Sequence, residues 1–82
     1  MEETIRRVLV EYARLPVDVA GVGADDDLYA LGFTSHSSVN VMLGLEDAFD
    51  IEFPDALLRK STFQSIAAMT GAVKSIVEPS TD

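Results

Sequence analysis

The chain has 82 residues, 48% of them apolar, which is enough for one small domain with a core and too short for two. It contains no cysteine, which excludes disulfides, cysteine metal ligands and cysteine nucleophiles, and its single histidine leaves no His-rich metal site. The net charge of −8 repels nucleic acid and anionic lipid, so we expect neither as a partner. With no secretory signal and no apolar run near the roughly 20 residues that cross a bilayer, we expect a cytoplasmic monomer that does not bind membranes.

The first helix is predicted from Glu2 to Arg14. Its apolar stripe has helical spacing and consists of Ile5, Val8, Leu9 and Tyr12. Pro16 ends this helix, and a long connection follows from Leu15 to Thr34 that shows neither helix caps nor strand alternation. The residues expected to anchor the connection to the core are Leu28, Tyr29, Leu31 and Phe33.

The second helix is predicted from Ser35 to Phe49 and carries an unusually wide apolar surface. One broad face holds Val39, Met42, Leu43 and Phe49, with Val41 and Leu45 on an adjacent one. Part of this surface should enter the core and part should remain for a partner, with the core favoured for any single residue. Glu46 and Asp47 lie at the C-terminal end, where the helix dipole disfavours negative charge, so a role other than stability is indicated.

Two further helices complete the predicted fold. Pro54 and Asp55 open a short helix that ends near Leu58. Residues 61–64 match a capping box and predict a last helix over residues 62–77, whose inward residues are Phe63, Ile66, Ala67, Thr70, Val73 and Val77. Residues 78–82 form a polar tail that should fray. The prediction is an all-α, four-helix bundle with three longer helices, one short helix and a long first loop.

Charge is distributed unevenly along the chain. Between Arg14 and Arg59 there is no lysine or arginine, whereas the same stretch holds nine acidic residues. A charged surface often serves solubility alone. The one-sided distribution favours docking of basic partners.

Two segments carry a family resemblance: Leu31-Gly32-Phe33-Thr34-Ser35-His36, and Leu45-Glu46-Asp47-Ala48-Phe49-Asp50-Ile51-Glu52-Phe53-Pro54-Asp55. They resemble the acyl carrier protein family, whose signature is Leu-Gly-x-Asp-Ser-Leu followed by a helix ending in Leu-Glu-x-x-Phe-x-Ile-x-x-Pro-Asp. The resemblance spans nearly the whole chain and implies a carrier domain over residues 1–77. It places Ser35 on the serine that the family uses to attach 4′-phosphopantetheine.

The resemblance also implies the function and the partners. Such a protein holds an acyl or aminoacyl group as a thioester on the arm, delivers it to partner enzymes and catalyses nothing itself. The implied partners are a phosphopantetheinyl transferase, an acyl- or amino acid-activating ligase and downstream acyl-transfer enzymes. The residues expected to meet them are Thr34, His36, Val39, Met42, Glu46 and Asp47.

Two positions depart from the family signature. Thr34 stands in place of aspartate, and His36 in place of a leucine that the family offers to partners. With its Thr-Ser pair and its Ile-Glu-Phe-Pro-Asp segment, this chain is similar to a group of small carriers. These carriers are loaded with an amino acid by ligases that resemble class II aminoacyl-tRNA synthetases. That likeness would make the cargo glycine or another small amino acid.

Other interpretations remain open from the residues alone. Ser35 could be a plain helix cap in an unmodified acidic adaptor that binds basic partner proteins. A hydrolase would need His36 as the base for Ser35, but adjacent helix residues point apart. Ser37 and Ser38 are attachment candidates by proximity only. A calcium loop starting at Asp25 fails, because Tyr29 stands where an oxygen ligand is required.

Overall fold

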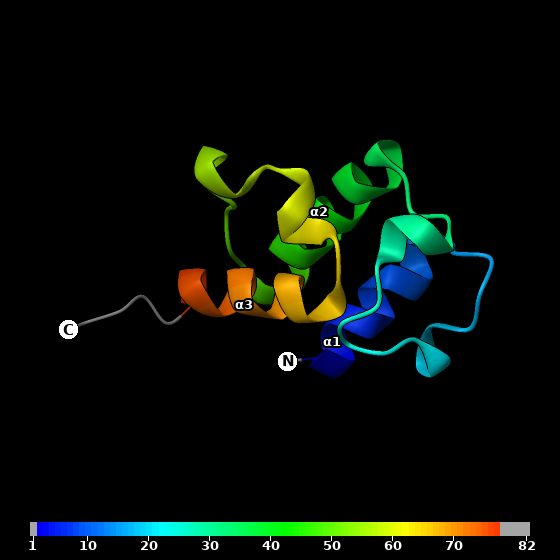
Figure 1. The fold of residues 1–82 in the computed structure, drawn as a ribbon. Helices are drawn as coiled ribbons and strands as arrows, with labels where there is room; N and C mark the ends of the chain where they lie inside the picture. The colour runs from blue at the N-terminus through cyan, green and yellow to red at the C-terminus, as the bar shows by residue number, and fades with distance from the viewer. Residues whose placement is uncertain (1, 78–82) are drawn as a thin grey trace.

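The computed structural model describes residues 2–77, and the predicted tail at 78–82 lies outside them. The longer elements are α1 (Glu2–Val8), which continues as a π-helical turn η1 (Leu9–Ala13), then α2 (Ser35–Phe49) and α3 (Ile66–Val77) (Figure 1). The 3₁₀ turns are η2 (Val19–Gly21), η3 (Leu28–Leu31), η4 (Asp55–Leu57) and η5 (Lys60–Phe63). The all-α prediction is confirmed. Within residues 2–77, no helix combines the length and the apolar character needed to span a bilayer.

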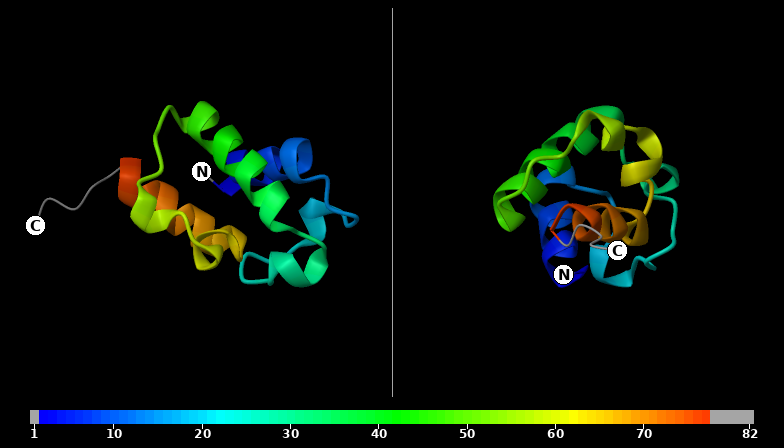
Figure 2. Two further views of the ribbon diagram at one scale, coloured as in Figure 1. Left: turned by 90° about the horizontal axis from the view of Figure 1, so that it is seen from above. Right: turned by 90° about the vertical axis from the view of Figure 1, so that its left-hand side faces the viewer.

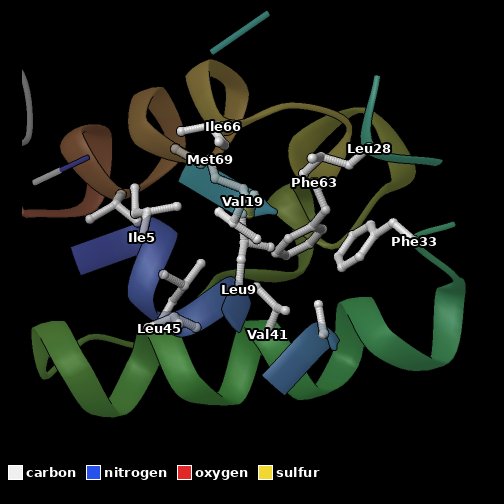
Figure 3. Packing of buried hydrophobic residues seen from close by; sticks show 14 of the residues in the cluster. Ile5, Leu9, Val19, Leu28, Phe33, Val41, Leu45, Phe63, Ile66 and Met69 are labelled. Atoms are coloured by element: carbon white, nitrogen blue, oxygen red, sulfur yellow. The ribbon is translucent and has the colours of Figure 1, made fainter. Parts of the chain in front are cut away.

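The core forms where α2 packs against the first helix. Val41, Gly44 and Leu45 are the buried residues of α2 (Figure 3). Leu9 lies opposite them on η1 and is fully buried. On the far side, Ile66 and Met69 of α3 close the same cluster. Burial of a large apolar side chain contributes about 1.5–3 kcal/mol, so these few contacts hold the middle of α2 in place.

The first helix covers the predicted range but is less regular. Its last turn is π-helical, and Arg14 ends it in the left-handed region at φ 49°. Ile5, Val8 and Leu9 are buried as expected. Tyr12 does not enter the core: 39% of it is exposed, and its ring lies against Gly44 instead.

The long connection is more ordered than its sequence suggested, and the expectation that it lacks caps was wrong. The Asp18 carboxylate accepts a hydrogen bond from the Ala20 amide, and Asp27 accepts one from the Tyr29 amide. These caps start η2 and η3. Local Asx capping of this kind needs only one aspartate before each turn, a weak sequence signal.

Side chains also fix the connection to the rest of the molecule. The Arg6 guanidinium donates to the carbonyl oxygens of Val19 and Val22 at 2.7 and 2.8 Å. Leu28 and Phe33 are buried, as predicted. The connection is therefore anchored at η2 by hydrogen bonds and at η3 by apolar packing.

The beginning of the last helix was predicted wrongly. Ser65, not residues 61–64, supplies the cap: its hydroxyl accepts a hydrogen bond from the Ala68 amide at 3.0 Å. Residues 60–63 form a separate 3₁₀ turn in which Thr62 and Phe63 are buried. Phe63 therefore lies before the helix, but it is buried as predicted, and so are Ile66 and Val73. Ala67 and Val77 are exposed, and Met69 and Ala72 are buried instead.

The close approach at Gly44 gives a test of the core. A Cβ atom there would lie 2.7 Å from the Tyr12 ring and 2.9 Å from Val8 Cγ1. We expect Gly44→Ala to lower the free energy of unfolding by about 1–3 kcal/mol through overpacking. The control is Gly71→Ala in α3, where nothing lies within 4 Å, and a gain of about 0.5–1 kcal/mol is expected. Urea denaturation of both variants measures the difference, and equal stability would contradict the packing.

Candidate functional site

Ser35 is the first residue of α2 and is exposed to solvent. Thr34 precedes it as the N-cap, and its Oγ1 accepts a hydrogen bond from the Ser37 amide at 3.1 Å. The Ser38 amide donates to the Thr34 carbonyl at 2.8 Å and begins the helical pattern. Threonine therefore replaces aspartate as the cap without loss of the helix start. The amides of Ser35 and His36 remain at the positive end of the 15-residue helix.

The hydroxyl groups around Ser35 differ in what they bond. Thr34 Oγ1 donates to Ser37 Oγ at 3.1 Å, and Ser38 Oγ donates to the Ser35 carbonyl at 2.7 Å. Among residues 2–77, nothing hydrogen-bonds to the Ser35 hydroxyl itself. Of the three serines at this helix start, Ser35 is thus the one whose oxygen is both exposed and unengaged.

The turn before α2 depends on a glycine. Gly32 has φ 108°, a conformation that L side chains rarely adopt, and its amide caps η3 through the Leu28 and Tyr29 carbonyls. A Cβ atom at this position would also lie 3.0 Å from Pro16 Cδ. This turn directs the chain from the buried η3 into α2 and places Ser35 at the surface.

A pocket of about 320 Å³ opens beside Ser35. Its lining comes from η3, α2 and the chain around η5, which runs back from the C-terminal end of α2 (Figure 2). The lining residues are Tyr29, Ser35, Ser38, Val39, Met42, Leu58, Arg59, Lys60 and Phe63. Sequence reasoning missed Tyr29, Leu58, Arg59 and Lys60 as site residues, because they lie in turns whose approach to Ser35 has no periodic signal.

Lys60 and Tyr29 make a direct contact in this pocket. Lys60 Nζ lies 4.8 Å from the centre of the Tyr29 ring, in cation–π geometry. Burial raises the pKa of Tyr29; the Ser38 hydroxyl opposes the rise and the Asp27 carboxylate adds to it. Tyr29 is therefore a neutral phenol at physiological pH.

The apolar residues of α2 differ in how far they are exposed to solvent. Val39 and Leu43, one turn apart, are each 53% exposed. Val39 is therefore exposed, as the predicted partner contact requires, and the general preference for core packing does not hold for it. Met42 is half-buried at the pocket wall, and Leu45 is fully buried. His36 is exposed next to Ser35.

The two acidic residues at the end of α2 have different surroundings. Glu46 is half-buried, and its Oε2 accepts a hydrogen bond from the Phe53 amide at 2.8 Å. Asp47 is exposed. The expectation that both acids lack a stabilising role was therefore wrong for Glu46, which ties the segment after α2 back to the helix.

The chain is similar in sequence to known proteins. The family described as the phosphopantetheine attachment site matches residues 3–72, and the chain belongs to that family. An aminoacyl carrier protein of Agrobacterium fabrum is 47% identical over 95% of this chain and 94% of its own. Aminoacyl carrier protein 1 of Bradyrhizobium diazoefficiens is 34% identical over 76% of this chain and 69% of its own.

Solved structures agree in fold. In a crystal structure of an engineered Bradyrhizobium japonicum glycine:[carrier protein] ligase complexed with carrier protein from Agrobacterium tumefaciens and AMP, the matching chain has a TM-score of 0.88 and 49% identity. The alignment covers 90% of this chain and 99% of that one. A solution structure from A. tumefaciens has a TM-score of 0.76 and 47% identity, covering 95% and 94%.

The protein is thus a carrier protein with 4′-phosphopantetheine as its prosthetic group, as the sequence resemblance implied. The expected likeness to small aminoacyl carriers is confirmed. The residues present suit the group: an exposed serine hydroxyl stands at the positive end of a helix, where a phosphodiester is favoured. The chain has no cysteine, so a thiol has to come from the prosthetic group.

The contrast between Glu46 and Asp47 can be measured. We expect Glu46→Ala to lower the free energy of unfolding by about 1–2 kcal/mol, because the Phe53 amide loses a charged acceptor in a half-buried site. Asp47→Ala, at the neighbouring exposed position, should change it by less than about 0.5 kcal/mol. Chemical denaturation checks both, and an equal loss in the two variants would refute a structural role specific to Glu46.

Proposed function

We propose that Ser35 is the attachment site of the phosphopantetheine arm. The observation that carries this proposal is the exposed Ser35 hydroxyl, unbonded within residues 2–77, at the N-terminus of α2. In the attachment reaction, Ser35 Oγ forms a bond to the β-phosphorus of coenzyme A. The pyrophosphate bond breaks, adenosine 3′,5′-bisphosphate leaves, and the hydroxyl proton passes to a base of the transferase.

The cargo we propose is a small amino acid, with glycine as the first candidate. The support is the similarity to aminoacyl carrier proteins and to the carrier chain crystallised with a glycine:[carrier protein] ligase. The bound arm supplies a thiol that holds the cargo as a thioester. The role of this chain is to present the thioester at high effective concentration to its partners.

The chain itself has no catalytic role in this proposal. A serine nucleophile needs a base within hydrogen-bond reach, and the single histidine of the chain, His36, is the helix neighbour of Ser35 and points away from it. Activation and transfer belong to the partners: a phosphopantetheinyl transferase, an ATP-dependent amino acid-activating ligase and a downstream acyl-transfer enzyme.

We place the protein in the cytoplasm, with residues 1–77 as the carrier domain.

The proposed docking surface for these partners is the exposed face of α2 around Ser35. Val39 supplies an exposed apolar contact one helical turn from Ser35, and Asp47 supplies a negative charge further along. Thr34 and His36 flank Ser35 at the start of the helix, and Met42 lines the pocket about two turns further along. Glu46 contributes charge to this surface while it holds the Phe53 amide.

Attachment can be tested directly. The apo-protein is incubated with coenzyme A, Mg²⁺ and a broad-specificity phosphopantetheinyl transferase, and its intact mass is measured. We expect one added phosphopantetheine group, no addition in Ser35→Ala, and normal addition in the matched controls Ser37→Ala and Ser38→Ala. A mass gain that persists in Ser35→Ala and disappears in either control would move the site to another serine.

Docking can be tested on the holo-protein with the glycine:[carrier protein] ligase, ATP and glycine. We expect Val39→Glu to lower kcat/KM for glycine loading by about tenfold, equivalent to 1.4 kcal/mol, because a charge replaces an apolar contact. Val10→Glu is the matched control: Val10 is 59% exposed but lies on η1, and loading should be unchanged. Equal rates for the two variants would exclude the Val39 surface from docking.

A further inference from the structure

The pocket beside Ser35 combines two kinds of surface. Its apolar lining includes Val39, Met42 and Phe63. The lining also includes the cationic residues Arg59 and Lys60. A volume of about 320 Å³ is at the small end of the range of roughly 300–1,000 Å³ usual for small-molecule sites. The pocket therefore suits a slender ligand with an anionic group at one end and an apolar segment next to it.

The two positively charged residues of the pocket contrast with the net negative charge of the molecule. The chain carries −8 overall and has only six lysine and arginine residues, none of them between Arg14 and Arg59. The turn at η5 brings two of these six back to the start of α2, beside Ser35. An anion attached at Ser35 would thus lie at the N-terminus of α2 and beside a pocket that two cationic residues help to line.

Both cations are positioned before any ligand arrives. The Lys60 ammonium rests 4.8 Å from the centre of the Tyr29 ring, and Arg59 Nε donates to the Ala56 carbonyl at 2.9 Å. The Tyr29 phenol is uncharged at physiological pH and therefore does not neutralise the Lys60 charge. Pre-positioning lowers the entropy lost when a ligand binds.

We propose that this pocket is a binding subsite for the first half of the phosphopantetheine arm, with Lys60 and Arg59 at the phosphodiester and the gem-dimethyl segment on Val39, Met42 and Phe63. The arm begins with an anionic phosphodiester and continues with a branched hydrocarbon, and the pocket beside Ser35 offers both cationic and apolar side chains for these two groups. The subsite depends on the proposed attachment at Ser35.

The same two positive charges disfavour entry of an aminoacyl group into the pocket. The α-ammonium group of a bound amino acid would be repelled by Lys60 and Arg59. The arm is therefore held near its base, while the thioester end stays outside and accessible to a partner enzyme. Lys60 and Arg59 are positioning residues in this arrangement and take no part in chemistry.

The test uses holo-protein whose single phosphopantetheine group has first been verified on Ser35 by mass spectrometry. We expect nuclear Overhauser contacts between the gem-dimethyl protons of the arm and the Met42 and Phe63 side chains, and a ³¹P shift that moves toward the free-arm value at 1 M salt. Lys60→Met keeps an apolar side chain of similar length and should reduce the docked population about two- to fivefold, as loss of one exposed ion pair would. Lys60→Arg should restore it.

The control is Lys74→Met, an exposed lysine of α3 that does not line the pocket, which should leave the contacts and the ³¹P shift unchanged. Holo-protein without contacts to Met42 or Phe63 would overturn the subsite and leave attachment intact. Equal effects of Lys60→Met and Lys74→Met would overturn the role of Lys60. Absence of the group from Ser35 would overturn attachment and the subsite together.

Discussion

The contact between α2 and the first helix is the interaction on which the rest of the molecule depends. Gly44 lets the Tyr12 ring and the Val8 side chain approach the α2 backbone, and Val41 and Leu45 fill the space beside them. These contacts lie in the middle of α2. The first turn of the helix is consequently held at a fixed position without being covered, which is what an exposed attachment residue requires.

Much of α2 could be predicted from the sequence, because its signals are local. Its start at Ser35 follows from the Thr34 cap, and its end at Phe49 from the change of pattern that precedes Pro54. The face that enters the core was harder to assign, since nearly every side of the helix carries an apolar residue. Only packing against α1 and η1 decides that Val41 is buried and Val39 is exposed.

The segments that were predicted poorly are the 3₁₀ turns. A single aspartate before η2 or η3 is too common to mark a turn, and the Arg6 bonds that secure η2 join residues far apart in sequence. The segment at η5 illustrates the opposite error: residues 61–64 fit a capping box, but residues 60–63 form a separate 3₁₀ turn in which Thr62 is buried. For the site, the family pattern pointed to Ser35 as the proposed attachment residue. The pocket beside Ser35 depends on the return of η5 toward the start of α2, for which the sequence has no pattern.

The central claim is that the phosphopantetheine arm is attached to the Ser35 hydroxyl at the start of α2. The most direct measurement is peptide mapping by mass spectrometry of the protein purified from its native host, with the thioester preserved. We expect phosphopantetheine on the peptide that contains Ser35, and release of a small amino acid on treatment with hydroxylamine. A phosphopantetheine group on any other residue, or native protein without the group, would contradict the central claim.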